Sequence, residues 1–214
     1  MTKKEVQKRV LQNGKPLDLK KFEWDEKTNT FSSNEDNLVL DFNYVDDCTF
    51  KTGSDCTFDT RDFCTFKTGS NCTFKTGSNC TFKTGFNCTF NTGFNCTFKT
   101  GSNCTFKTGS NCTFNTESDC TFDTWSNCTF NTESDCTFKT GSDCTFDTRD
   151  NCVVVRRDVY EIIEVPVNRQ IKLNGFEVKG FTYLDENKSI ELSNGAKVSE
   201  KTIREALEFV AKHK

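Results

Sequence analysis

Fourteen cysteines recur along the chain at a constant interval of eight residues, and no cysteine lies elsewhere. An extracellular disulfide framework has varied spacings, because each pair of cysteines closes a different loop. A constant interval instead marks an internal repeat. The cysteines are Cys48, Cys56, Cys64, Cys72, Cys80, Cys88, Cys96, Cys104, Cys112, Cys120, Cys128, Cys136, Cys144 and Cys152.

The repeat unit, or octad, reads Cys-Thr-Phe-(Lys/Asn/Asp)-Thr-Gly-Ser-Asn, and its residues are numbered here as positions 1 to 8. Thirteen copies keep Cys-Thr-Phe-x-Thr over residues 48–151. Degenerate copies flank them, with Leu40 and Phe42 at positions 1 and 3 of residues 40–47, and Val154 at position 3 of residues 152–159. Atypical end units are expected of a stacked array. The position-3 residues of the thirteen copies are Phe50, Phe58, Phe66, Phe74, Phe82, Phe90, Phe98, Phe106, Phe114, Phe122, Phe130, Phe138 and Phe146.

The pattern within an octad predicts a five-residue strand followed by a three-residue corner. In an extended chain, positions 1, 3 and 5 share one face, so Cys, Phe and the second Thr should point inward. The first Thr and the polar residue at position 4 should point outward. Thr and Phe favour strands. In the corner, Gly can adopt a positive φ and Asn or Asp can hydrogen-bond locally.

One such strand cannot stabilise itself. Fixing eight residues costs roughly 8–16 kcal/mol of backbone entropy, whereas burying one Phe and one Cys returns about 3–4 kcal/mol. The octads should therefore stack as a mainly β fold, a β-solenoid with units ~4.8 Å apart and columns of Phe and Cys.

Each coil of this solenoid could hold two octads or three. The octads at 112–119 and 128–135 are identical and a different one lies between them, which favours two octads per coil. Fifteen octads, over residues 40–159, would then form about 7.5 coils and a rod of ~36 Å.

The inward Cys-x-Phe pair resembles the small-x-large core pattern of pentapeptide-repeat proteins, which form right-handed β-helices. That match covers five residues of each unit, and the Gly-Ser-Asn corner departs from it. The full octad, with its lead-in at residues 31–34 and 38–42, is similar to Cys-Thr-Phe octapeptide-repeat proteins of bacteriophages and their bacterial hosts. The resemblance implies a solenoid and a phage or bacterial source. It transfers no activity and no functional residue.

Residues 1–39 are expected to form an N-terminal cap. Val6, Val10 and Leu11 share one face of a helix predicted over residues 3–12, which Asn13-Gly14 should end. Alternation at Phe22, Trp24 and Phe31 predicts a short hairpin over the first coil.

Residues 160–214 are expected to form a small C-terminal α+β domain. Strands are predicted over residues 160–165 and 170–173. Asn174-Gly175 should form a hairpin turn leading into a strand over 176–184. Asn194-Gly195 predicts a second hairpin within 189–198, and Ser199 should cap a final helix.

The composition argues against an active site and against nucleic-acid and membrane binding. The single histidine, His213, lies next to the last residue, and no nucleophile constellation, acid–base pair or phosphate loop is found, so we expect no enzyme, cofactor or small-molecule substrate. A net charge of −3 gives no bulk cationic field, which makes nucleic acid an improbable partner. The chain has no apolar run of the ~20 residues that a membrane span needs. No apolar h-region follows residues 1–5, so we expect no signal peptide, a reducing cytoplasmic or virion-associated location and no membrane.

The cysteines invite a metal or redox hypothesis, but zinc-type sites use closely spaced pairs, and a spacing of eight provides none. A column of thiols could still bind a soft ion. Disulfides along a column meet a geometric objection, because in-register Cβ vectors run parallel. We therefore predict free, buried, reduced cysteines and no metal site. Ice binding by the regular threonines is a weaker alternative, because only one Thr per octad faces outward, beside charged residues.

Surface charge and exposed aromatic residues suggest binding. Residues 64–111 carry five lysines and no acid, whereas residues 112–151 carry two basic residues and eight acids. Phe86, Phe94 and Trp125 replace Ser or Gly at corners and are candidates for protein contacts. The leading hypothesis is a structural or protein-binding rod that self-associates or binds another protein. The alternative is a decoy whose acidic face, 112–151, mimics nucleic acid for a host enzyme.

Overall fold

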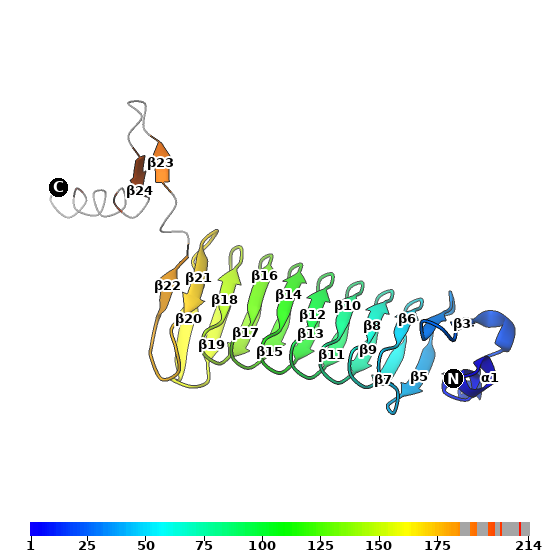
Figure 1. The fold of residues 1–214 in the computed structure, drawn as a ribbon. Helices are drawn as coiled ribbons and strands as arrows, with labels where there is room; N and C mark the ends of the chain where they lie inside the picture. Colours follow the sequence, from blue (N-terminus) through cyan, green and yellow to red (C-terminus); the bar gives the residue numbers. More distant parts are fainter. Residues whose placement is uncertain (185–188, 192–196, 200–201, 203–209, 211–214) are drawn as a thin grey trace.

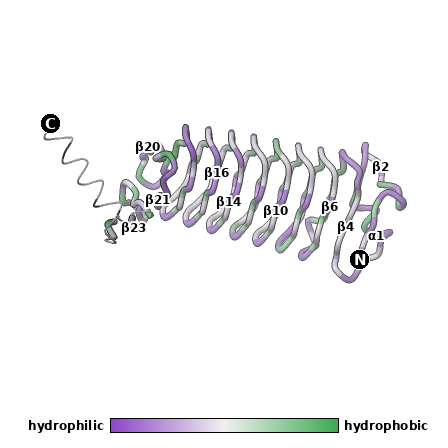
Figure 2. The backbone as a smooth tube through the Cα atoms, turned by 90° about the horizontal axis from the view of Figure 1, so that it is seen from above, coloured by the Kyte–Doolittle hydropathy of each residue, from purple (hydrophilic) through white to green (hydrophobic). Residues whose placement is uncertain are grey.

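The chain folds into a β-solenoid with two octads per coil and about eight coils (Figure 1). The computed structural model describes residues 1–184, 189–191, 197–199, 202 and 210. Seen from above, the coils follow one another as evenly spaced windings (Figure 2). The fold class predicted from the repeat, a mainly β solenoid with a 16-residue coil, is confirmed.

Each coil contributes one strand to each of two sheets. Residues 16 apart pair in parallel and in register, as Phe66, Phe82 and Phe98 do. The parallel strands of sheet A are β5 (Leu38–Phe42), β7 (Thr57–Thr60), β9 (Thr73–Lys75), β11 (Thr89–Asn91), β13 (Thr105–Lys107), β15 (Thr121–Asp123), β17 (Thr137–Thr140) and β19 (Val153–Arg156). Those of sheet B are β4 (Thr30–Ser32), β6 (Thr49–Lys51), β8 (Thr65–Lys67), β10 (Thr81–Lys83), β12 (Thr97–Lys99), β14 (Thr113–Thr116), β16 (Thr129–Thr132) and β18 (Thr145–Asp147).

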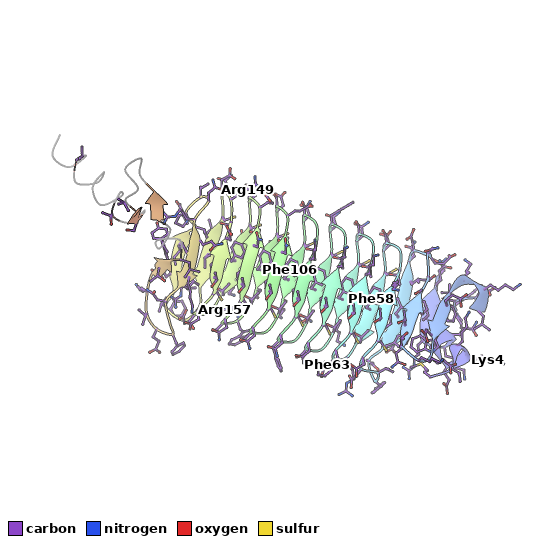
Figure 3. All side chains as sticks on the ribbon, turned by 45° about the horizontal axis from the view of Figure 1, so that its top comes forward. Lys4, Phe58, Phe63, Phe106, Arg149 and Arg157 are labelled. Carbon is purple, nitrogen blue, oxygen red and sulfur yellow. The ribbon has the colours of Figure 1, made fainter. Side chains whose placement is uncertain are left out.

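The core between the sheets consists of two facing columns of phenylalanine rings. Within a column, successive rings stack with centroids 4.8 Å apart and planes at 3°, as in Phe66 and Phe82. Across the core, rings meet edge to face, with the centroids of Phe82 and Phe90 5.2 Å apart. Both geometries suit the aromatic quadrupole. Phe58 and Phe106 lie inside the rod in Figure 3. The inward and outward directions predicted for positions 1 to 4 are confirmed, and position 5 is buried or half-buried.

The corners use glycine differently from the prediction. The residue with positive φ is the Asn or Asp at position 8, as in Asn71 and Asn79 with φ of 56° and 57°. Position-6 glycines have ordinary φ, and close packing of the coils requires them instead. A Cβ on Gly69 would lie 2.2 Å from Ser54 Oγ and 3.0 Å from Ser54 N of the neighbouring coil.

The first coil starts earlier than predicted. Phe31 pairs with Phe50, so β4 already belongs to the solenoid. The predicted register of the first degenerate octad was wrong by two residues, because Leu40 pairs with Phe58 and Phe42 pairs with Thr60. The turn at 43–47 is two residues longer than a standard corner, which hid this register. The register at the other end is confirmed, since Val154 pairs with Phe138.

An antiparallel cap covers the N-terminal end. Helix α1 spans only Lys3–Gln7, followed by β1 (Val10–Gln12), β2 (Lys15–Pro16), the 3₁₀ turn η1 (Leu19–Lys21) and β3 (Glu23–Asp25). The predicted helix over residues 3–12 was therefore wrong beyond Gln7. Asn13 and Gly14 both have positive φ and form a two-residue hairpin turn, while β1 pairs with β5. The predicted hairpin at Trp24 and Phe31 is confirmed by the pairing of β3 with β4.

Strands β20 (Glu161–Glu164) and β21 (Gln170–Leu173) cover the C-terminal end by pairing antiparallel with β19 and β18. The predicted strand after Asn174-Gly175 was misplaced. The connection runs over 174–180 and β22 spans Phe181–Tyr183. Strands β23 (Ser189–Glu191) and β24 (Lys197–Ser199) pair antiparallel, as the second hairpin predicts. Most of the predicted final helix lies outside the described residues.

Candidate functional site on the rod surface

The cysteines occupy the positions predicted for them inside the rod. All fourteen are free and buried. Each thiol from Cys48 to Cys144 donates to the carbonyl two residues before it, as Cys72 Sγ does to Ser70 O at 3.4 Å, and Cys152 Sγ donates to Glu133 O at 3.4 Å. Across the core a cysteine lies beside the position-5 Thr of the preceding octad, as Cys56 does beside Thr52. The thiols therefore act as small core residues with satisfied weak donors.

Burial raises the pKa of the thiols, and hydrogen bonds between thiols of neighbouring coils shift it in both directions. These hydrogen bonds lower the pKa at Cys64, Cys104, Cys112, Cys136 and Cys144. Burial raises the pKa of Cys48 to about 12, with smaller contributions from Cys64 and Asp47. The pKa of Cys56 is also raised, first by its hydrogen bond with Cys72 and then by burial. Because the thiolate is the form that reacts and binds metals, such a thiol is unreactive in the folded rod. Within the described part of the chain, no group of three or more His, Cys, Asp or Glu residues is placed to hold a metal ion. His213 lies outside that part.

Two edges of the rod carry the corners. Turns from sheet B to sheet A form the B-to-A edge, and turns from sheet A back to sheet B form the A-to-B edge. Phe63 and Arg157 lie on the A-to-B edge, opposite Arg149 on the B-to-A edge (Figure 3). The three aromatic residues singled out in the sequence do not form one patch, because Phe94 and Trp125 lie on the A-to-B edge and Phe86 on the other.

Sequence reasoning missed further aromatic residues of the A-to-B edge. The exposed aromatic side chains there are Tyr44, Phe63, Phe94, Trp125, Tyr160 and Phe176. Phe63 lies at position 8 and Tyr44 in the long first turn, so a search of positions 6 and 7 alone passes over both. Successive corners lie on opposite edges of a coil with two octads. Placing every second corner on the same edge would therefore have shown that these aromatic residues form one row.

The central part of the A-to-B edge is uncharged. Turns 77–79, 93–95, 109–111 and 125–127 contain only Gly, Ser, Asn, Phe94 and Trp125. An exposed surface rich in aromatic residues and poor in charge has the composition of the core of a protein interface. Arg157 lies over the Trp125 ring, 5.4 Å from its centroid, at the C-terminal end of this stretch.

Phe63 is also held in a strained conformation. Its φ is 57°, in the left-handed region where the other octads use Asn or Asp, and its side chain is 56% exposed. A bulky side chain in this region is a conformational outlier.

The acids of the C-terminal half gather on the B-to-A edge. Five of the eight acids in residues 112–151 lie in its turns, namely Glu117, Asp119, Glu133, Asp135 and Asp150. Arg149 in the same turns forms an ion pair with Glu133. The remaining acids are divided between the two faces and the other edge.

The outward faces carry columns of position 2 and position 4. On sheet B the position-2 column is threonine from Thr30 to Thr145, and position 4 carries successive lysines in its N-terminal half. On sheet A position 4 carries charges of both signs, and Lys75 forms an ion pair with Asp59 at 2.9 Å. Only one Thr column faces outward on each sheet, beside charged residues, as the sequence predicted.

Comparison with family models, with curated proteins and with solved structures gave no match. The function therefore has to be argued from these surfaces. None of the described helices is long and apolar enough to cross a membrane.

Proposed function

We propose that the protein is a non-enzymatic rod of a phage or its bacterial host, which binds protein along its A-to-B edge. Its partner in this proposal is a second copy of the same chain. The observation that carries the proposal is the row of exposed aromatic residues on an edge whose central turns are uncharged. Neither the ladder hydrogen bonds nor the core uses these side chains, so their presence on a regular repeat calls for a separate reason.

Phe63 supports the same conclusion. Asn or Asp at this position would relieve the backbone and extend the side-chain ladder seen where Asn95 Nδ2 donates to Asn79 Oδ1 at 3.3 Å. The chain instead places a large exposed ring there, at a cost in stability. Strain of this kind collects at functional sites.

The spacing of the rings favours a second copy as partner. Phe63, Phe94 and Trp125 lie in every second turn, and the turns between them carry only Gly-Ser-Asn. Rings of an antiparallel copy can enter those gaps, and neighbouring rings would then lie one coil apart. The core phenylalanines already stack at that separation, 4.8 Å between centroids. Because the central turns are uncharged, two copies meet there without repulsion.

Sedimentation equilibrium of the full chain tests this proposal. We expect a concentration-dependent monomer–dimer equilibrium, and at least a tenfold weaker dimer for F94S/W125S, because each ring buries a large apolar area on association. F86S removes a similar exposed ring from the opposite edge and should leave the dimer unchanged. A chain that stays monomeric at high concentration, or an equal effect of F86S, would contradict the proposal.

A second candidate function rests on the acidic B-to-A edge. Five acids on consecutive coils form a rod-like row of negative charge, the feature expected of a nucleic-acid mimic. The decoy hypothesis is tested by competition between the rod and duplex DNA for a purified DNA-processing enzyme of the host. We expect the wild-type rod to displace DNA and D119N/D135N to lose this effect. Displacement by both proteins equally, or by neither, would reject the decoy.

A further inference from the structure

Four lysines form a ladder on the outer face of sheet B. Lys51, Lys67, Lys83 and Lys99 occupy position 4 of β6, β8, β10 and β12, which pair in register. All four side chains are exposed. The core rings on the last three of these strands are 4.8 Å apart, which gives the rise from one lysine to the next.

This ladder has no counter-charge of its own. In the part of the chain that the structure describes, no carboxylate forms an ion pair with any of the four ammonium groups. The neighbouring position-4 residues are uncharged, with Ser32 before the ladder and Asn115 and Asn131 after it. Four like charges at strand spacing repel one another, and a bound polyanion would relieve that repulsion.

A column of hydroxyl groups runs beside the ammonium groups. Thr49, Thr65, Thr81 and Thr97 lie two residues before each lysine on the same outer face, about 7 Å away along the strand. No hydrogen bond joins these hydroxyls to another described side chain. The face thus offers a rigid double row, with a donor and acceptor hydroxyl beside each cation.

Shallow grooves follow the ladder on its side toward the B-to-A edge. One, of about 400 Å³, is lined by Lys51, Lys67 and Gly69, together with Ser32, Ser33 and Asn34. The other, of about 310 Å³, is lined by Lys83, Lys99, Gly85 and the exposed Phe86. Glu117 lies at the far end of the second groove and limits an anionic ligand to the first four coils. The glycines leave the floor of both grooves open.

We propose that this ladder binds an acidic polysaccharide that carries one carboxylate on each sugar ring. The ~4.8 Å between adjacent β-strands is about the length that one sugar ring occupies in such a chain. Carboxylates on the side of the chain that faces the sheet can therefore meet lysines of the ladder, while ring hydroxyls bond the threonines beside them. The threonine and lysine columns are about 7 Å apart along the strand. A sugar ring can span that distance with its carboxylate at the lysine and its hydroxyls at the threonine.

A nucleic acid fits the face less well. Proteins that bind single strands combine a basic track with several aromatic side chains on which bases stack. Outward positions of β6 to β12 in sheet B carry only Thr and Lys, and Phe86 lies at the edge rather than on the face. The acidic turns beyond Glu117 would also repel a long polyanion of high charge density.

Oligogalacturonate of about ten sugars is the probe, and binding to the full chain is measured by calorimetry at low and at physiological salt. We expect binding that weakens as salt rises, and at least a tenfold loss of affinity in K67Q/K83Q. K107Q/K139Q is the matched control, because it removes the same two charges from position 4 of sheet A. That control should keep wild-type affinity.

Four further results would overturn the proposal. The first is no binding of oligogalacturonate at low salt, and the second is an equal loss in both double variants. The third is tighter binding of single-stranded oligothymidylate or of inorganic polyphosphate, which would assign the ladder to phosphate chains. Hyaluronate, with one carboxylate on every second sugar, tests the spacing and should bind at least tenfold more weakly. The fourth result is equal binding of hyaluronate, which would contradict the requirement for a carboxylate on each ring.

Discussion

Position 8 of the octad shows how a single backbone requirement selects residue type. The corner closes in three residues only if its last residue adopts a left-handed conformation, and Asn and Asp tolerate that conformation better than other side-chain-bearing residues. Across the thirteen full octads this position is Asn or Asp except at Phe63. The glycines respond to a different constraint, the approach of the next coil. Gly and Asn or Asp look like one turn motif in the sequence, but two separate constraints select them: the approach of the next coil selects Gly, and the left-handed backbone selects Asn or Asp.

Replacing Phe63 with Asn should stabilise the rod. The change removes the penalty of a bulky residue at φ 57° and lets an amide join the ladder between Asp47 and Asn79. We expect a gain of about 1 kcal/mol in the free energy of unfolding, measured by urea denaturation. Phe94→Ser, at a corner position with ordinary φ, should change stability by less than about 0.5 kcal/mol. Unchanged or lower stability of Phe63→Asn would show that Phe63 is not strained.

The buried thiols should make the rod sensitive to alkali. The pKa of Cys48 is raised from 9.0 to about 12, so the folded state keeps its proton while an unfolded chain loses it. The contribution of this thiol to the free energy of unfolding is fully present below about pH 9 and is lost as the pH rises toward 12. The free energy of unfolding should fall by at most about 1.4 kcal/mol per pH unit for each thiol whose pKa is raised in this way.

Urea unfolding at pH 8, 9.5 and 10.5 measures this loss, and Cys48→Ala should show a shallower decline than the wild type. Titration with a thiol reagent is an independent check. The native protein should react slowly, and all fourteen cysteines should react after denaturation. Rapid reaction of the native protein would mean that the columns are open to solvent.

At the scale of single elements, the repeat predicted the strands well and the ends poorly. Inside the array every octad has identical neighbours, so period and alternation suffice to place Cys, Phe and Thr. At the ends the partner strand is unique and local signals compete. Val6, Val10 and Leu11 fit a helical face, but Asn13-Gly14 is also a hairpin turn, and pairing of β1 with the free edge of β5 decides in its favour. Asn174-Gly175 also predicted a hairpin turn, but the strand that should follow it directly begins only at Phe181. A side chain from another strand determines the conformation of the connection.

That side chain belongs to Arg156, which occupies the position-5 column and is fully buried. Its guanidinium holds Asp158 through two hydrogen bonds, of 3.2 and 2.5 Å, and donates to the carbonyls of Val178, Gly175 and Gly180. These bonds fix the 174–180 connection against the end of β19. No local feature of residues 174–180 indicates such a partner, so sequence reasoning could not place β22.

Arg156→Met should loosen the C-terminal cap. The change leaves Asp158 buried without its partner and the loop carbonyls unsatisfied, which costs roughly 3–5 kcal/mol. Hydrogen exchange should show faster exchange in residues 170–183 and little change at β10. R156M/D158N removes both charges and should recover part of the loss. Equal protection of the cap in wild type and Arg156→Met would contradict this role.

On the scale of the whole molecule, the two ends decide whether the solenoid stays finite. Parallel strands β4 to β18 and β5 to β19 would present unpaired edges at both ends, and antiparallel strands cover each of them. An antiparallel strand ends the run of identical coils, because its residues cannot continue the Phe and Cys columns in register. Exposed edges of this kind are templates for association.

Removal of the caps should therefore cause association whose form depends on which cap is lost. Deleting residues 1–28 bares β4 and β5 at one end only, and two such ends can meet head to head and close into a dimer. Deleting residues 157–214, with Arg156→Thr restoring the residue typical of position 5, bares the other end in the same way. A chain lacking both caps has two different bare ends, and each can extend the sheets of the next copy without limit.

Light scattering and electron microscopy distinguish these outcomes. All three deletions are made with F94S/W125S, so that the copies do not associate through the A-to-B edge. In that background we expect dimers, formed through the bare ends, from each single deletion. We expect filaments from the double deletion, with a fibre reflection at about 4.8 Å from the continued strand stack. A soluble monomer from the double deletion would show that β1, β3, β20 and β21 do not act as caps.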